Sequence, residues 1–404
     1  MKNRYRFHLL GLAHLPCDPQ YNACAFTMKN YKLAKMLTDL GHEVIYYGAE
    51  GSKVQCSKFV QTHTLSDLRN DYGDGDNRFD IGYDFTRGDF RQDFGLDPKK
   101  PSTQKFLRSC IEAINSDKKP DDFLLLTMGH YHKPVHDATN LFLTCEPGIG
   151  YRGSYCRFRA FESHYLRSYM QGVETQNKCV DGHNYDRVIP NYFEGKDFEF
   201  CGDKGGYVLY VGRLIWRKGL SIAYQAAQAA GVPLVICGQG GMVKEDGSFM
   251  STVDPKVSFP AGGWRYHGYA SPEDRKDLMM HAQAVLCPTI YMEPFAGVHV
   301  EAMLCGTPVI TSNFGVYGGE TFIDGVHGFK CNTLKDYVFA IQMANTLNYS
   351  AIWTWARQFL CENVAIKYQR WFEDLYEVYL SSCSQGRGWG SIPDTVPDWY
   401  KKTY

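Results

Sequence analysis

The 404-residue sequence lacks several patterns that would place it in common protein classes. It contains no run of about 18 apolar residues, the length a membrane-spanning helix requires, so we expect no membrane span. Its 43 Lys and Arg residues nearly balance its 44 Asp and Glu residues, and the resulting net charge of −1 makes a nucleic-acid partner a poor expectation. No G-x-G-x-x-G motif follows the first predicted strand, which disfavours a nicotinamide-dependent dehydrogenase.

The cysteine and histidine patterns do not predict a metal site. The 14 cysteines are scattered without a C-x-x-C pair, and several lie in apolar strands, as Cys237 and Cys287 do. The histidines of HYHKPVH (130–136) have no Cys or carboxylate beside them to complete a zinc site. The short apolar stretch at the N-terminus is interrupted by His8 and His14, so it indicates a buried strand rather than a signal peptide. We therefore expect a reduced, cytoplasmic protein with no bound metal.

The N-terminal half alternates apolar strands with an amphipathic helix. A helix over 26–40, stopped by Gly41, lies between two strands and forms a βαβ unit. Residues 66–104 are polar and predict a surface excursion. The strands predicted in this half are 6–13, 42–48, 123–129 and 140–145.

A second alternating block follows a lapse of the pattern at 187–206, which predicts a linker. Its helices are predicted at 218–230 and 271–282, the latter with Ser271 as N-cap and Pro272 in the first turn. Its strands are predicted at 207–212, 233–238, 284–289 and 308–312, with an irregular stretch at 241–263. The sum predicts two Rossmann-like α/β/α domains facing across a cleft.

The most informative segment is EPFAGVHVEAMLCGTPVIT (293–311). Glu293 follows a predicted strand, and Pro294 suits the start of a helix. Gly297 allows a close approach of the backbone, and Glu301 lies eight residues after Glu293. The free N–H groups and the positive dipole at such a helix start suit a diphosphate.

A second candidate element is YVGRLIWRKG (210–219). Arg213 and Lys218 follow the end of a strand and lie five residues apart. Two fixed cations there would hold a diphosphate and stabilise the charge that develops when it leaves. Taken alone, the pattern is more typical of a solvated basic turn, and it is the downstream Glu293 segment that favours the functional interpretation.

Together these segments resemble the signature of the GT-B enzymes of glycosyltransferase family 4. Two glutamates separated by seven residues and a G-R-x4-K-G segment match over about 207–332. The resemblance implies the GT-B fold, a C-terminal helix that returns to the N-terminal domain, and no need for a metal. It also implies that Glu301 binds the ribose and that Glu293 lies near the donor sugar. The other donor-binding candidates that it implies are Phe295, Ala296, Gly297, Val298, Gly238 and Tyr269.

The N-terminal half departs from the family pattern. It lacks the Gly-Gly turn after the first strand, and Glu146 of EPGIGY (146–151) stands where the family carries a histidine. Glu146 is thus a catalytic candidate that binds the donor sugar or positions the acceptor, or else a strand-end carboxylate that faces water. Similar enzymes with an E-x-G-I-G-Y stretch form a subgroup. The candidates for the acceptor side are His130, His132, Tyr151 and the basic residues Arg152, Arg157 and Arg159.

The predicted organisation is an acceptor-binding domain (1–195), a nucleotide-sugar-binding domain (206–360) and C-terminal helices (361–404). An aromatic, amphipathic pattern over 355–382 belongs to those helices. The predicted function is a retaining transfer of sugar from a UDP- or GDP-sugar to an acceptor hydroxyl. Arg213, Lys218, Glu293 and Glu146 would be its catalytic residues, with no permanently bound cofactor. The alternatives are an epimerase or hydrolase of the same fold, a non-catalytic sugar-binding protein, and a nucleic-acid-modifying glycosyltransferase; the oligomeric state is open.

Overall fold

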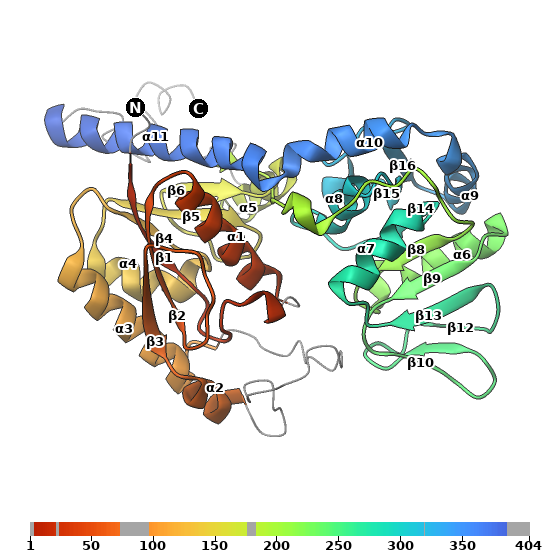
Figure 1. The fold of residues 1–404 in the computed structure, drawn as a ribbon, viewed down its shortest axis with the longest axis horizontal. Helices are drawn as coiled ribbons and strands as arrows, with labels where there is room; N and C mark the ends of the chain where they lie inside the picture. Colours follow the sequence, from red (N-terminus) through yellow and green to blue (C-terminus); the bar gives the residue numbers. More distant parts are fainter. Residues whose placement is uncertain (1–3, 22–23, 73–96, 176–182, 319, 386–404) are drawn as a thin grey trace. The chain divides into compact units, whose positions relative to one another are not determined.

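The computed structural model describes residues 4–21, 24–72, 97–175, 183–318 and 320–385 (Figure 1). They divide into two compact units, which are described separately. Unit 1 contains the residues up to Tyr192 together with those from Cys361 onward, and unit 2 is Phe193–Leu360. Of the surface excursion predicted at 66–104, residues 73–96 lie outside the described residues.

Unit 1 is built on a parallel sheet with the strand order β3-β2-β1-β4-β5-β6-β7. The order reverses between β1 and β4, which pair with each other, and this is the doubly wound arrangement of a Rossmann-like domain. The strands are β1 (Arg6–Leu10), β2 (Glu43–Ala49), β3 (Lys58–His63), β4 (Phe123–Leu125), β5 (Leu143–Ile149), β6 (Phe158–Phe161) and β7 (Arg187–Val188).

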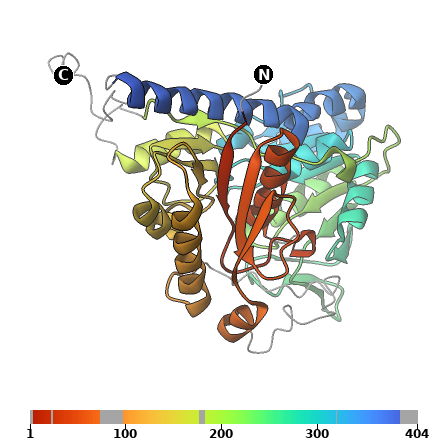
Figure 2. The ribbon, with the colours of Figure 1, turned by 60° about the vertical axis from the view of Figure 1, so that its left-hand side comes forward.

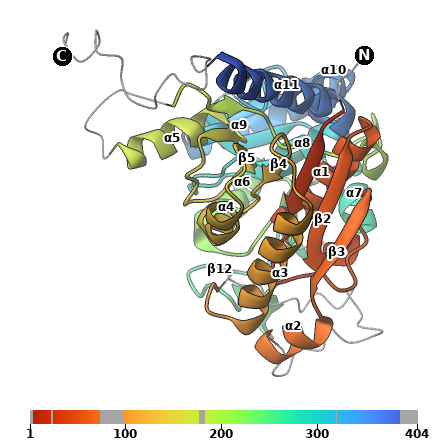
Figure 3. The same ribbon diagram turned by 90° about the vertical axis from the view of Figure 1, so that its left-hand side faces the viewer.

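Helices cover both faces of this sheet (Figures 2 and 3). One face packs against α1 and α11 in a core where the Phe7 and Phe372 rings lie 4.7 Å apart. The other face packs against α3 and α4. The return of the C-terminal helix to the N-terminal domain is therefore confirmed. The helices are α1 (Ala25–Asp39), α2 (Leu65–Tyr72), α3 (Pro101–Asp117), α4 (Lys133–Thr139), α5 (His164–Glu174) and α11 (Cys361–Gln385).

Unit 2 has the same doubly wound architecture as unit 1, with a parallel sheet in the order β13-β9-β8-β14-β15-β16. The prediction of an irregular stretch at 241–263 is wrong, because a small antiparallel sheet, β10-β11-β12, lies within it. The strands of the main sheet are β8 (Val208–Val211), β9 (Leu234–Cys237), β13 (Trp264–Gly268), β14 (Ala284–Cys287), β15 (Val309–Ser312) and β16 (Gly328–Cys331). The small sheet consists of β10 (Gly241–Val243), β11 (Phe249–Ser251) and β12 (Ser258–Phe259).

The main sheet of unit 2 is also covered on both faces, by α7, α8 and α10 on one side and by α6 and α9 on the other. The predicted start of α7 is confirmed, because the Ser271 hydroxyl accepts the Asp274 N–H at 3.0 Å. The helices are α6 (Leu220–Ala230), α7 (Pro272–His281), α8 (Gly297–Leu304), α9 (Leu334–Met343) and α10 (Tyr349–Ala356). Within the described part of the chain, no helix combines the length and apolar character that crossing a bilayer requires.

Candidate functional site

The strand order of unit 2 reverses between β8 and β14, which pair in parallel with Leu209 opposite Val285. In open α/β sheets, ligands bind outside the carboxyl ends of the strands at such a reversal. Arg213 and Lys218 follow the carboxyl end of β8, and Glu293 follows that of β14. The topology therefore brings the two sequence segments singled out above to one place.

Direct contacts tie the loop after β8 to the loop after β14. The carbonyl oxygen of Arg217 accepts the backbone N–H of Ile290 and the hydroxyl of Thr289, both at 3.0 Å. Gly219 has a φ of 79°, and a Cβ at this position would lie 1.9 Å from the carbonyl oxygen of Pro288. Only glycine allows this approach, which places the neighbouring Lys218 against the second loop.

The cation of Lys218 lies in a charged and aromatic environment. Its Nζ donates to Oε1 of Glu293, and the two side chains are only 20% and 14% exposed. The same Nζ lies 4.9 Å from the centre of the Tyr291 ring, and the Arg217 guanidinium lies 4.7 Å from that ring. Burial, together with the Arg213 and Arg217 cations, lowers the pKa of Lys218 to about 8. The adjacent carboxylate opposes this effect, because it favours the charged ammonium.

Helix α8 begins beside this ion pair with an unusual backbone. Its N-cap, Ala296, has a φ of 69°, a left-handed conformation that is uncommon for a residue with a Cβ. Within the protein, a Cβ at Gly297 would have its nearest neighbour at 3.4 Å in Phe193, so packing inside unit 2 does not by itself require glycine there. The Phe295 ring is buried 5.5 Å from that of Phe359, so only the backbone of Phe295 is available to a ligand.

Glu301 lies on α8, and its Oε2 is 3.6 Å from Nε of Arg275 on α7. The Glu301 side chain is 19% exposed and that of Arg275 is 38% exposed. Sequence reasoning did not single out Arg275, because one arginine within a charged helix carries no distinguishing signal. Val298, in the first turn of α8, is partly buried.

Gly238 belongs to the same end of the sheet. Its N–H donates to the carbonyl of Gly268 at 2.9 Å, and a Cβ at Gly238 would lie 2.2 Å from the carbonyl oxygen of Gly212. The close approach of these backbones therefore requires glycine at 238. Tyr269 follows directly after β13 and is partly buried.

In unit 1, the alternative that Glu146 is a strand-end carboxylate facing water is wrong. Glu146 lies inside β5 and is 0% exposed. Its oxygens accept the backbone N–H groups of Tyr155 (2.7 Å) and Cys156 (2.8 Å) and the hydroxyl of Tyr151 (2.8 Å). Burial raises the pKa of Glu146, whereas these hydrogen bonds lower it. The carboxylate thus anchors the connection between β5 and β6.

A buried lysine, which sequence reasoning missed, holds the same connection. Lys29 of α1 donates to the carbonyl of Gly148 at 2.6 Å and pairs with Glu162. Its Nζ also lies 4.5 Å from the centre of the Phe26 ring, which in turn meets Tyr151 edge-on at 5.9 Å. A lysine on a predicted amphipathic helix gives no sign of such burial.

The histidines of the HYHKPVH segment have separate environments. His132 is buried, which lowers its pKa to about 3, and its Nδ1 accepts the N–H of Thr127 at 3.2 Å. The His130 ring stacks on Tyr155 at 5.0 Å, and Nδ1 of His136 lies 3.1 Å from the hydroxyl of Tyr155. Among the residues that the structure describes, no three His, Cys, Asp or Glu side chains are placed to hold a metal ion.

The basic run predicted at the acceptor side is divided between buried and exposed positions. Arg159 is 1% exposed, and its Nε and Nη2 each donate to Asp186 at 2.9 Å. The prediction that Arg159 edges the acceptor side is therefore wrong, because a carboxylate already engages its buried guanidinium. Arg152 is exposed, and its Nη2 donates to the hydroxyl of Tyr169 at 3.1 Å.

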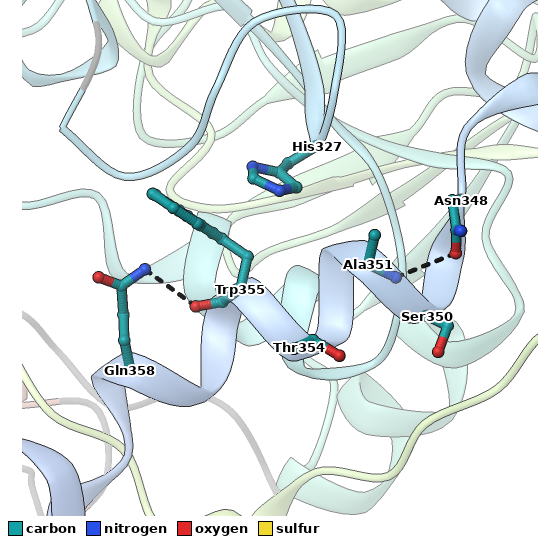
Figure 4. Close-up of a pocket in the computed structure, with 7 residues that line it drawn as sticks. All are labelled: His327, Asn348, Ser350, Ala351, Thr354, Trp355 and Gln358. Atoms are coloured by element: carbon teal, nitrogen blue, oxygen red, sulfur yellow. Dashed lines mark hydrogen bonds between the residues drawn. The ribbon is translucent and has the colours of Figure 1, made fainter.

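A separate shallow cavity of about 640 Å³ lies beside α10 (Figure 4). The indole N–H of Trp355 donates to the carbonyl of Thr321 at 2.9 Å, and the Trp355 ring stacks on His327 at 4.7 Å. The lining includes no Lys or Arg to bind a diphosphate and none of the predicted site residues. It consists of His327, Asn348, Ser350, Ala351, Thr354, Trp355 and Gln358.

Comparison with known sequences gives a family match, which lies in unit 2, and several relatives that match part of the chain. Residues 196–342 match the family model described as glycosyl transferases group 1. An uncharacterized glycosyltransferase of Methanocaldococcus jannaschii is 35% identical over 114 residues, which are 27% of each chain. The glycogen synthase of Mycobacterium tuberculosis is 33% identical over 129 residues, 31% of this chain and 30% of the relative. The chain thus matches less than a third of the length of these relatives.

Solved structures extend the likeness to both units. A glycosyltransferase involved in avilamycin A biosynthesis superimposes with a TM-score of 0.59 and 17% identity, covering 92% of this chain and 98% of that one. The sucrose-phosphate synthase of Thermosynechococcus elongatus gives a TM-score of 0.57 and 17% identity, covering 92% and 99%. Anabaena HepE in complex with UDP and glucose gives 0.57 and 14%, covering 92% and 100%. The chain therefore has the GT-B fold, and residues 196–342 are similar to the group 1 glycosyl transferases.

Proposed function

We propose that the chain is a retaining glycosyltransferase that moves a sugar from a nucleoside diphosphate to an acceptor hydroxyl. One observation carries the proposal: the cation of Lys218 and the start of α8 lie together at the strand reversal of unit 2, around Glu293. The likeness of residues 196–342 to the group 1 glycosyl transferases supports the same conclusion. Because the structures of Anabaena HepE hold UDP or UDP-glucose, we propose a UDP- or GDP-sugar as the donor.

In this proposal, the diphosphate binds to the first N–H groups of α8 and to the side chains of Arg213 and Lys218. These positive groups stabilise the negative charge that grows on the diphosphate as its bond to the sugar breaks. The acceptor oxygen forms its new bond on the face from which the diphosphate departs, and the acceptor proton passes to a phosphate oxygen. Glu301 binds the ribose, and the reaction needs neither a protein nucleophile nor a metal.

The remaining donor contacts in the proposal come from the backbone. The N–H groups from Phe295 to Val298 face the phosphate and the sugar, and the backbone beside Gly238 and Tyr269 borders the base. In unit 1, we propose that the connection anchored by Glu146 and Tyr151 contributes to the acceptor side, together with His130 and His132. We expect these unit 1 residues to act chiefly by shaping that surface, because Glu146 and His132 are buried.

A thermal-shift screen with UDP-, GDP-, ADP- and dTDP-sugars tests the proposal. A ligand that binds only the folded state at about 100 times its Kd stabilises the protein by about 2.7 kcal/mol, so one donor should raise the melting temperature by several degrees. That donor should then release its nucleoside diphosphate in the presence of acceptor sugars. Lys218→Met and Glu301→Gln should lower the rate of release by at least ~10-fold each, the scale of one lost charged contact in the transition state. A protein that binds none of the four classes would contradict the proposal.

A further inference from the structure

Glu293 already pairs with the Lys218 ammonium, which is the group that the proposed diphosphate would bind. Lys218 donates to the Glu293 carboxylate, and both groups are largely shielded from water. The loops that carry them are joined at the Arg217 carbonyl, so neither loop separates from the other without losing hydrogen bonds. For Lys218 to exchange Glu293 for a diphosphate, its side chain must therefore move while the two loops stay joined. The four methylene groups of the side chain allow this movement.

Tyr291 limits where that side chain can go. Its ring lies 4.9 Å from the Lys218 ammonium and 4.7 Å from the Arg217 guanidinium. A cation near an aromatic face is attracted to it, and the attraction is stronger when water is excluded. The ring and the carboxylate thus both hold the same ammonium.

A bound diphosphate must share Lys218 with a carboxylate of its own charge sign. Each phosphate oxygen that takes a hydrogen bond from Lys218 weakens the attraction between Lys218 and Glu293. The two anions also repel each other across a site from which water is partly excluded. Both effects weaken binding of the diphosphate. They act as long as a nucleoside diphosphate remains bound, including after the sugar has left.

We propose that Glu293 is a positioning residue that competes with the diphosphate for Lys218 and thereby speeds release of the nucleoside diphosphate product. The inference rests on the proposed donor site. According to this inference, Glu293 lowers the affinity for the nucleotide, whereas a residue that only binds the donor would raise it. Glu293→Gln keeps the shape of the side chain and removes its charge, so it should bind the product more tightly and release it more slowly.

Isothermal titration with UDP, GDP, ADP and dTDP tests the inference. With the nucleotide that wild type binds, Glu293→Gln should lower the Kd by roughly five- to ten-fold, the size expected for one partly buried ion pair. Lys218→Met should raise the Kd. The matched control is Glu245→Gln, because Glu245 is an exposed carboxylate in the same unit and its change removes the same charge. We expect this control to leave the Kd unchanged.

A double-mutant cycle separates competition for Lys218 from simple charge repulsion. In the Lys218→Met background, Glu293→Gln should lower the Kd by clearly less than it does in wild type, since the shared ammonium is gone and only the repulsion between the two anions remains to be relieved. An equal gain in both backgrounds would overturn the inference in favour of repulsion alone. A Glu293→Gln variant that binds the nucleotide as wild type does, or more weakly, would also overturn it. If wild type binds no nucleoside diphosphate, the proposed function itself fails.

Discussion

The close approach at Gly219 gives the sharpest test of how the candidate site is built. An alanine at this position would have to adopt a φ near 79° and would place its Cβ 1.9 Å from the carbonyl oxygen of Pro288. The left-handed conformation alone costs about 1 kcal/mol with a Cβ present. Relieving the overlap requires the backbone itself to move, which adds roughly 1–3 kcal/mol. We therefore expect Gly219→Ala to destabilise unit 2 by about 2–4 kcal/mol.

Gly231 supplies a matched control at the other end of α6. Its φ is 69°, and a Cβ there would meet no atom within 4 Å. Gly231→Ala should therefore cost only the conformational term of about 1 kcal/mol. In a domain of this size, 1 kcal/mol corresponds to about 2–4 °C, so calorimetry should show losses of about 2–4 °C for Gly231→Ala and about 5–15 °C for Gly219→Ala. Equal losses in the two variants would show that the close approach to Pro288 does not require glycine at position 219.

Three further predictions concern other parts of the two units. Glu146→Ala leaves the N–H groups of Tyr155 and Cys156 buried without an acceptor and should cost about 2–4 kcal/mol in denaturant titration, whereas Glu146→Gln retains an acceptor and should cost about 1 kcal/mol. Equal costs would contradict the anchoring role. Ala296→Val places a β-branched residue at positive φ and should cost about 2–3 kcal/mol, whereas Ala296→Gly should be within about 1 kcal/mol of wild type. Lys218 must be protonated to bind a diphosphate and its pKa is lowered to about 8, so nucleotide affinity measured by titration calorimetry should fall as pH rises through about 8. A Lys218→Met variant with the same pH dependence would contradict this assignment.

Much of the fold follows from sequence patterns that reflect local physics. The N-cap at Ser271 and the end of the helix at residue 230 were predicted because capping depends on neighbouring residues alone. The small sheet β10-β11-β12 was missed because its strands are only two or three residues long, too short for a period of two to show. The pattern at 355–382 looked continuous, but α11 begins only at Cys361, because Phe359 and Leu360 pack into the core of unit 2.

The candidate site was predicted only in part, and the reason is tertiary packing. The segments carrying Lys218 and Glu293 could be placed at strand ends because parallel strands end at one edge of a sheet. The contact of Tyr291 with Lys218 depends on how the two loops pack, and an aromatic two residues before Glu293 was the available signal. The burial of Glu146 and Lys29 was not predictable, because sequence periodicity does not tell which loop will cover a polar group.

The structure of the chain with bound nucleoside diphosphate would test the central claim most directly. We expect phosphate oxygens within hydrogen-bonding distance of Lys218 and of the first N–H groups of α8, with the Lys218 ammonium drawn away from Glu293. A nucleotide bound elsewhere on the molecule, for example in the cavity beside α10, would contradict it. So would a diphosphate at the start of α8 that Lys218 does not touch.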